Sequence, residues 1–316
     1  MKADEMYVIL EIVQIIFLIA VAPLIQGVVK KTKALLQGRR GPSIWQPYYD
    51  LRKYMLKDEV VSVHASWLFL ITPYVVFAST IAVVAMIPVF MTDTLLSFTG
   101  QLVLVVYLFG MARFFTALSG IDTGSSFGAM GSSRDMFVSG LAEPVLFVTL
   151  LAVALPLKTT NVTLLTNRVI ANHALLLSPT FYLVFLAFFI LVVTETGRIP
   201  VDNPDTHLEL TMIHEGMLLE YSGRRLGLMM WSAWIKQTLM FTLLIDFCGP
   251  WGISRDGHGW ILIASLAFLF LKLIILAIVV AFVEMSYAKI RFFRIPRLLS
   301  AAFALSMIAI VTEYLL

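Results

Sequence analysis

The sequence contains one cysteine, Cys248, among 316 residues. A single thiol cannot close a disulfide bond within the chain. It also cannot complete an iron–sulfur or zinc site from the thiolates of this chain alone. We therefore expect no cofactor in this chain.

Charged residues are also scarce. They make up 14% of the chain, whereas soluble domains carry about a quarter. Hydrophobic residues make up 59%, and the mean hydropathy is +0.90. Because a soluble protein cannot bury that much apolar surface in one core, we expect the chain to lie in a lipid bilayer. Nothing in the composition indicates a nucleic-acid partner.

Recognisable catalytic motifs are missing as well. The sequence has no catalytic triad, nucleophile elbow, haem motif or dinucleotide fingerprint. His207 and His214 lie seven residues apart without the HExxH spacing of a zinc helix, so we expect no metal there. A membrane enzyme acting alone is therefore poorly supported.

Long apolar runs are what the sequence does contain. Each has about 20 residues, enough to cross roughly 30 Å of hydrocarbon as a helix. We predict an all-α, polytopic membrane protein with about eight transmembrane helices in one integral domain, residues 1–316. The first run lacks a small-residue cleavage site, so we expect a retained helix. The predicted spans are residues 6–29, 67–91, 98–121, 135–157, 174–195, 227–248, 260–284 and 298–316.

Basic residues indicate how these helices are oriented. Helices that cross a membrane in turn place alternate loops on the same side. On one side, the segments 30–66, 122–134, 196–226 and 285–297 hold sixteen of the 23 Lys and Arg residues. The segments on the other side hold only four, Lys2, Lys158, Arg168 and Arg255. Positive residues favour the cytoplasmic side. Both termini are therefore predicted outside and the large loops in the cytoplasm. Setting this topology and contacting anionic lipid head groups can be the only roles of the basic residues in these loops.

Ionisable residues also occur inside the apolar spans, where they are costly. Glu143 lies about eight residues into the fourth span, roughly 12 Å deep at 1.5 Å per residue. Two interpretations remain open: ion pairs between helices, or a hydrated proton relay. We expect Glu11 and Asp246 to be interfacial. The other ionisable residues in or at the ends of spans are Arg113, Glu195, Lys236, Lys272 and Glu284.

The first cytoplasmic loop contains a predicted amphipathic helix, Tyr48 to Leu56. Tyr48, Leu51 and Met55 would share one face of this helix. A helix of this kind can lie at the membrane surface.

The third loop is acidic, and Asp205 is expected to cap a helix that runs to about Tyr221 and ends at Gly223. An acidic loop on the positive side is expected to dock against a basic surface, such as the first loop or a partner. The middle loop, residues 119–135, is rich in Gly and Ser and lacks the GxxxxGK[ST] pattern. Its glycines predict a tight, partly buried crossing.

An ordered set of motifs lies along the chain. It consists of Arg40, Gly41, Pro42, Gln46, Asp50 and Lys53 in the first loop; Arg134 and Glu143; Glu195, Thr196, Arg198, Pro200 and Asp202; and the pairs Glu209-Leu210 and Glu220-Tyr221. This set resembles the family of membrane subunit 1 of respiratory complex I. The sequence is most similar to the hydrogenase branch, formate hydrogenlyase subunit 4 and hydrogenase-4 component C, through the stretches 119–127 and 220–223. It departs from complex I at Asn203, Pro204 and Asp205.

The resemblance implies a prokaryotic cytoplasmic (inner) membrane protein that anchors a peripheral arm and couples electron transfer to movement of H⁺ or Na⁺. The residues implied in a proton pathway are Glu143, Glu195, Asp202, Glu209, Glu220, Lys236, Lys272 and Glu284. The residues implied in docking that arm, or in a quinone-like chamber, are Arg39, Arg40, Gln46, Asp50, Lys53, Arg134, Arg198 and Asp205.

The implied partners are hydrogenase-like large and small iron–sulfur subunits and antiporter-like membrane subunits, with iron–sulfur clusters, and NiFe in a hydrogenase, held by those partners. The alternative is the quinone-chamber subunit of a complex I-like NADH or ferredoxin dehydrogenase, with quinone as a partner. A stand-alone transporter is disfavoured because the sequence shows neither repeat symmetry nor spans interrupted at mid-membrane.

Overall fold

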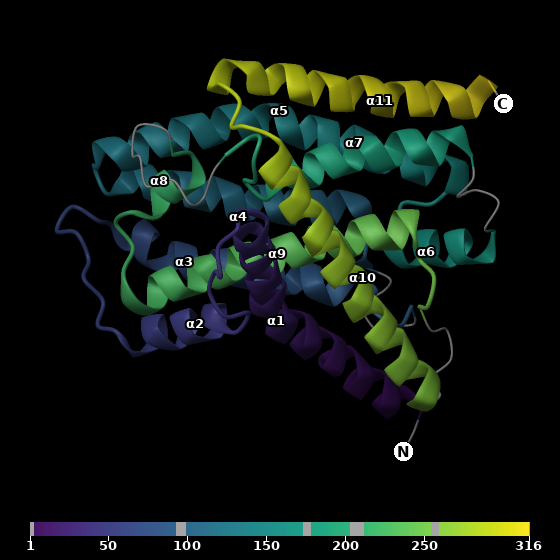
Figure 1. Cartoon of the computed structure of the whole chain (residues 1–316), viewed down its shortest axis with the longest axis horizontal. Helices are drawn as coiled ribbons and strands as arrows, with labels where there is room; N and C mark the ends of the chain where they lie inside the picture. Colours follow the sequence, from purple (N-terminus) through teal and green to yellow (C-terminus); the bar gives the residue numbers. More distant parts are fainter. Residues whose placement is uncertain (1–2, 93–98, 173–177, 203–211, 254–258, 316) are drawn as a thin grey trace.

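The computed structural model describes residues 3–92, 99–172, 178–202, 212–253 and 259–315. This part of the chain is almost entirely helical (Figure 1). The helices are α1 Ala3–Leu36, α2 Gln46–Leu56, α3 Trp67–Met86, α4 Leu102–Asp122, α5 Ser126–Leu157, α6 Val162–Ala171, α7 Pro179–Glu195, α8 His214–Leu218, α9 Gly223–Cys248, α10 Gly259–Ser286 and α11 Ile295–Leu315, the last preceded by a 3₁₀ turn, Phe292–Arg294.

The predicted polytopic, all-α architecture is confirmed. Within the described residues, seven helices are long and apolar enough to cross a membrane: α1, α3, α4, α5, α9, α10 and α11. The predicted span 174–195 is represented by α7, an apolar helix of 17 residues, which extends only about 25 Å at 1.5 Å per residue. Residues 173–177, which precede it, lie outside the described residues. Among the described residues, seven helices are therefore long enough for a full span, and the eighth predicted span, α7, is shorter than that length.

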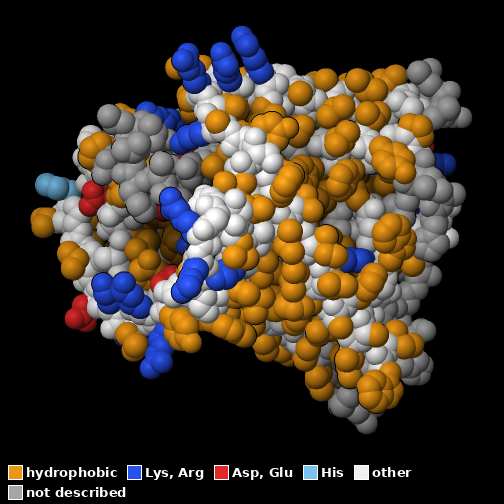
Figure 2. Space-filling model, in the orientation of Figure 1, with side chains coloured by type: hydrophobic (Ala, Val, Ile, Leu, Met, Phe, Trp, Pro, Cys, Tyr) orange, Lys and Arg blue, Asp and Glu red, His pale blue; other side chains and the backbone are white. Residues whose placement is uncertain are grey.

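The bundle has two distinct ends. Figure 1 shows α2 and α8 at one end, while α6, the start of α1 and the end of α11 lie toward the other. Figure 2 shows hydrophobic side chains over much of the visible face, with many of its Lys and Arg side chains toward the end that carries α2 and α8. The two termini thus lie toward the same end, as the basic-residue pattern predicts. Which end faces the cytoplasm remains a prediction.

The glycine-rich segment 119–135 is mostly helical, because α4 continues to Asp122 and α5 begins at Ser126. The predicted inter-helix segment 122–134 is therefore wrong. The tight, buried crossing is confirmed: a Cβ on Gly128 would lie 2.4 Å from the backbone oxygen of Gly120. Small residues allow the backbones of membrane helices to approach this closely, so glycine here serves helix packing rather than a loop.

The third loop differs from its prediction. Asp205 lies outside the described residues, α8 covers only His214–Leu218, and Gly223 begins α9 instead of ending a helix. The first loop packs against this position. A Cβ on Gly223, where φ is +53°, would lie 2.9 Å from the backbone oxygens of Lys57 and Asp58. A tertiary contact therefore decides the boundary that local sequence could not.

Further contacts attach the first loop to the start of α9. The Ser222 hydroxyl donates to Val60 O (2.8 Å) and accepts from the Val60 N–H (2.7 Å). Arg225 forms an ion pair with Glu59 (2.5 Å). The expected docking between the first and third loops is thus present, although here the basic partner is on the third-loop side.

The predicted amphipathic helix is confirmed as α2, Gln46–Leu56. Leu51 is buried, and α2 packs on α1 and α9. The Tyr48 hydroxyl donates to Ala20 O on α1. Because α1 and α9 cover its apolar face, α2 lies on protein at the end of the bundle.

We predict that Gly128→Ala lowers the free energy of unfolding by about 1–3 kcal/mol, because the added methyl group overpacks a helix crossing. Thermal unfolding of the purified protein in detergent measures this change. Gly140→Ala is the matched control on the same helix: its Cβ would meet nothing within 4 Å. Equal stability of the two variants would show that the α4–α5 crossing is not tight.

Candidate functional site

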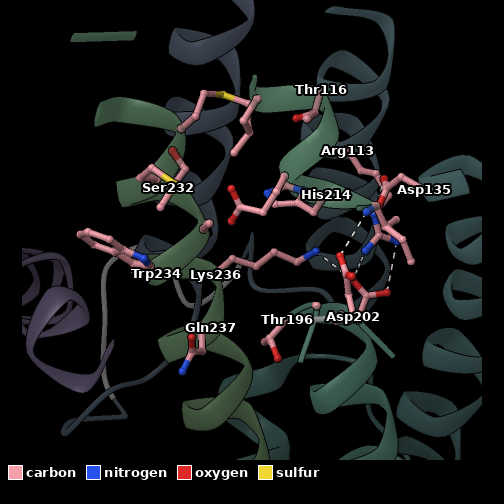
Figure 3. A pocket seen from close by; sticks show the side chains of 18 of the residues that line it. Arg113, Thr116, Asp135, Thr196, Asp202, His214, Ser232, Trp234, Lys236 and Gln237 are labelled. Carbon is pink, nitrogen blue, oxygen red and sulfur yellow. Dashed lines mark hydrogen bonds and ion pairs between the residues drawn. The ribbon is translucent and has the colours of Figure 1, made fainter. Parts of the chain in front are cut away.

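A cavity of about 550 Å³ lies among α1, α3, α4, α5, α7, α8 and α9, close to the bundle end with α2 and α8. One part of its wall is apolar and includes Phe109, Val138 and Met229. The polar part includes Arg113, Asp135, Glu195, Arg198, Asp202, His214, Lys236 and Gln237. Figure 3 shows Lys236 reaching across the cavity toward Arg113 and Asp135. The cavity thus joins an apolar volume to a set of buried charges.

Glu195, at the end of α7, is the centre of the first group of charges. Its carboxylate binds two nitrogens of the Arg113 guanidinium, at 2.5 and 3.2 Å, and Lys236 Nζ at 2.8 Å. The Glu195 side chain is only 3% exposed. Two cations thus compensate one buried carboxylate, and the fork geometry of arginine suits this bidentate contact.

Arg113 extends this group from the cavity toward α5. Its guanidinium lies 3.7 Å from Asp135 Oδ2 and 3.7 Å from Glu143 Oε1. Asp135 lines the cavity, whereas Glu143 is not among the lining residues and its side chain is 39% exposed. We call Arg113, Asp135, Glu143, Glu195 and Lys236 the first network. It holds three carboxyl groups against two cations, and it runs from the cavity to the outer surface of the bundle.

Arg198 is the centre of a second network, with Gln26, Lys33, Gln237 and Glu284. Its guanidinium donates to the side-chain oxygens of Gln26 and Gln237 and lies 3.5 Å from Glu284 Oε1. Lys33 Nζ contacts the other Glu284 oxygen at 3.1 Å. These contacts connect α1, α9, α10 and the turn after α7. The second network holds two cations against one carboxyl group, the opposite excess to the first.

The two networks are joined through the backbone. Glu195 and Arg198 are three residues apart on a turn that contains Gly197 (φ +60°), and Lys236 and Gln237 are consecutive on α9. A movement of either the turn or α9 therefore displaces one member of each network at the same time.

Other contacts hold α8 over the cavity. The Asp202 carboxylate accepts the Ile213 N–H (3.3 Å) and pairs with Lys289 (2.7 Å). Arg134 donates to Met212 O (3.1 Å). A Cβ on Gly131 of α5 would lie 2.9 Å from Ile213 O, so α8 packs directly on α5. The short helix is thus tied to charged residues on two sides.

Tyr221, just after α8, completes this wall. Its ring stacks on Phe69 with centroids 3.9 Å apart, and its hydroxyl donates to Phe69 O (3.0 Å). Burial raises the pKa of Tyr221 to about 12. The phenol therefore stays neutral and acts as a hydrogen-bond donor.

The structure gathers only part of the predicted pathway set. Glu143, Glu195 and Lys236 meet in the first network, Glu284 lies in the second, and Asp202 pairs with Lys289. Lys272 is separate from both, because its ammonium binds the backbone oxygens of Gly249 and Trp251. Glu220 is half-buried and is not among the cavity-lining residues, and Glu209 lies outside the described residues.

The predicted docking residues of the first loop do not line the cavity. Arg39, Arg40 and Lys53 are exposed, and the Gln46 amide donates to the carboxylate of Asp50 (2.9 Å) within α2. They form part of the end surface. The other predicted docking residues are Arg134 and Arg198, which lie in the contacts above, and Asp205, which lies outside the described residues.

The two residues expected to be interfacial, Glu11 and Asp246, are buried within the protein, and their depth in the membrane stays a prediction. Asp246 is 0% exposed and Glu11 is 7% exposed, so the protein encloses both side chains. Asp246 lies on α9, which is the most enclosed of the candidate spans described. Depth along one helix does not reveal which side is covered by neighbouring helices.

The predicted site does not include several residues of the two networks, nor the Lys289 partner of Asp202. The network residues concerned are Gln26, Lys33, Arg113, Asp135 and Gln237. One signal could have identified two of them. Gln26 and Gln237 are amide residues inside apolar spans, and such side chains need partners there. The partners themselves depend on how the helices pack.

Comparison with known proteins gives relatives along almost the whole chain. Residues 10–314 match the family described as NADH dehydrogenase. The chain is 33% identical to formate hydrogenlyase subunit 4 of Escherichia coli (strain K12), covering 97% of this chain and 99% of that protein. It is 32% identical to hydrogenase-4 component C of the same organism, covering 97% and 96%. It is 26% identical to the H-type subunit of NADH-quinone oxidoreductase from Ralstonia nicotianae, covering 82% and 76%.

A solved structure shares the fold. A chain of the membrane-bound sulfane sulfur reductase, an archaeal respiratory membrane complex, aligns with a TM-score of 0.82 at 18% identity, covering 96% of this chain and 98% of that one. The predicted resemblance is confirmed, including its greater similarity to the hydrogenase branch than to the complex I branch.

We predict that Glu195→Gln destabilises the protein by about 3–5 kcal/mol, because it leaves Arg113 and Lys236 buried without their shared anion. Lys236→Met should cost less, since Arg113 still binds Glu195. The double variant should lose less stability than the two single variants added together. Thermal unfolding of the four proteins measures the coupling, with Glu220→Gln as a half-buried control. Strict additivity would contradict a shared network.

Proposed function

The chain belongs to the NADH dehydrogenase subunit 1 family, and on that premise we propose that it is the membrane anchor and coupling subunit of a redox-driven ion pump. In this proposal a peripheral iron–sulfur arm of the [NiFe]-hydrogenase type docks on the end that carries α2 and α8. Antiporter-like membrane subunits bind beside the bundle. The relatives named formate hydrogenlyase subunit 4 and hydrogenase-4 component C support this form of the complex.

The observation that carries the proposal is the first network. Three carboxyl groups surround two cations there, so one carboxyl group can hold a proton without leaving a cation uncompensated. The neighbouring second network has one cation more than carboxyl groups. Displacing positive charge toward or away from Glu195 would then change the proton affinity of the first network. This is the chemistry required of a coupling subunit.

A mechanical connection from the docking end supports the same role. Arg134 and Asp202 hold the residues at the start of α8, and α8 forms part of the cavity wall. Asp202 is four residues beyond Arg198 and seven beyond Glu195. A partner that shifts α8 would therefore pull on the turn that carries both network centres.

Glu143 provides the route away from the cavity. It contacts Arg113 yet has a side chain that is 39% exposed on the outer surface of the bundle. Exposed carboxylates in an apolar span are costly against lipid. A neighbouring membrane subunit that covers this surface and accepts the proton would remove that cost.

The cavity itself favours the second candidate, a quinone-chamber subunit of an NADH or ferredoxin dehydrogenase. Its volume of about 550 Å³ and its mixed lining of apolar side chains with a few polar groups are typical of sites for small organic molecules. Hydrogen evolution and quinone reduction by the purified intact complex would distinguish the two candidates. The location proposed in both cases is a prokaryotic cytoplasmic membrane.

We predict that Glu143→Gln abolishes ion pumping while the complex still assembles and transfers electrons, because the amide cannot carry the proton. Ion uptake by vesicles that contain the complex, divided by its redox turnover, measures the effect. Asp58→Asn, at an exposed carboxylate in the first loop, should pump normally. Pumping at the wild-type ratio by the Glu143 variant would refute the proposed role.

We further predict that the purified chain alone has no redox activity and binds no metal, because iron–sulfur clusters and NiFe would be held by partner subunits. Among the described residues, no group of three or more His, Cys, Asp and Glu side chains is arranged to hold a metal ion. Elemental analysis and redox assays of the isolated chain test this. Tight, stoichiometric metal would contradict it.

A further inference from the structure

Asp246 stands out at the end of α9 farthest from α8. Its side chain is 0% exposed, and within the described residues neither carboxylate oxygen has a hydrogen-bond partner. An ionised carboxylate in this position is strongly destabilised unless a charge or a proton compensates it. The proposed pathway through the first network does not use this residue.

Lys272, on α10, provides the nearby charge. Its ammonium donates to Gly249 O (2.5 Å) and to Trp251 O, and it lies 4.8 Å from the centre of the Phe268 ring. Both carbonyl oxygens belong to the segment that directly follows α9. Gly249 is only three residues beyond Asp246, so the ammonium lies near the carboxyl group, although no ion pair within 4.0 Å joins them. The carboxyl group and the ammonium are thus coupled without being in contact.

A line of polar side chains runs along α9 toward Asp246. Thr238 and Thr242 are 0% exposed and precede Asp246 at intervals of four residues, so the three side chains follow one face of the helix. The Thr238 hydroxyl donates to Trp234 O and the Thr242 hydroxyl to Thr238 O. Lys236 of the first network lies ten residues before Asp246, a rise of about 15 Å.

We propose that Asp246 is a second proton-exchange site, through which protons pass between the first network and the end of the bundle opposite α2 and α8, with Lys272 compensating its charge. The inference rests on the proposed ion-pumping function and adds to it a site at the other membrane face. A proton-exchange role gives a reason for a carboxyl group in an enclosed position, where an apolar residue would be less costly.

The surroundings favour a proton over Na⁺ at this site. A bound metal cation needs several oxygen ligands, but the backbone oxygens of Gly249 and Trp251 are occupied by the Lys272 ammonium. The Asp246 carboxylate is then the one acidic group left to bind a cation, because the described residues include no second acidic side chain that interacts with it. A single carboxyl group with a nearby ammonium suits the uptake and release of one proton.

The test uses the intact complex reconstituted in vesicles, with proton movement and redox turnover measured together. Asp246→Asn is expected to keep electron transfer in the presence of an uncoupler and to lose proton translocation. Lys272→Met is expected to lower the proton-to-electron ratio, because an ionised Asp246 then has no compensating charge. Glu313→Gln is the matched control and should pump normally. The Glu313 carboxyl group lies near the end of α11, at the same end of the bundle as Asp246, and it accepts a hydrogen bond from the Thr180 hydroxyl.

Infrared spectroscopy provides a second measurement that a purely structural role would not affect. The carbonyl band of a protonated, buried carboxylic acid should be present in the wild-type complex and missing in Asp246→Asn, and Asp246→Glu should restore both the band and pumping. Wild-type pumping ratios in Asp246→Asn overturn the proposal. If that variant does not assemble, a wild-type ratio in Lys272→Met has the same consequence.

The two proposals fail in different ways. If Glu143→Gln abolishes pumping and the Asp246 and Lys272 variants pump normally, the complex is a pump and the second site is wrong. If every variant pumps at the wild-type ratio, the roles proposed for Glu143 and Asp246 are both wrong. If the wild-type complex moves no ions, the proposed function itself is wrong.

Discussion

The double ion pair at Glu195 is the interaction on which the rest of this structure depends. One carboxylate at the end of α7 binds Arg113 from α4 and Lys236 from α9, so three helices meet at one buried point. In hydrocarbon, each of these charges alone would be costly. Their mutual neutralisation allows the cavity wall to carry charge, and it fixes the positions of α4, α7 and α9 relative to one another.

The turn after Glu195 extends that constraint to the second network. Arg198 follows within one short turn, and its guanidinium connects Gln237 of α9 with Gln26 of α1 and Glu284 of α10. The first network has one carboxyl group in excess and the second has one cation in excess, so the ten charges of the two networks and the Asp202–Lys289 pair balance when all are ionised. Protonation of one network is therefore sensitive to the position of the other.

This arrangement gives a physical reason why one family of membrane subunits can serve different redox partners. The relatives named here belong to formate hydrogenlyase, hydrogenase-4 and NADH-quinone oxidoreductase, and a chain of the sulfane sulfur reductase has the same fold. In the proposed function, the redox chemistry is a property of the arm that docks at the α8 end. In the proposed function, the membrane subunit needs only to convert a displacement at that end into a change of charge at Glu195.

The sequence by itself determined the membrane class, most of the helices and the family, because hydropathy and ordered motifs are properties of neighbouring residues. It also predicted α2 and the close packing of the glycines at Gly120 and Gly128. Only the tertiary structure decided the partners. Arg113 and Glu195 are 82 residues apart, and Arg198 and Gln26 are 172 residues apart. Pairing over such separations, the enclosure of Asp246 and the change of Gly223 from a predicted helix end to a helix start all depend on which helices pack together, and no local pattern contains that information.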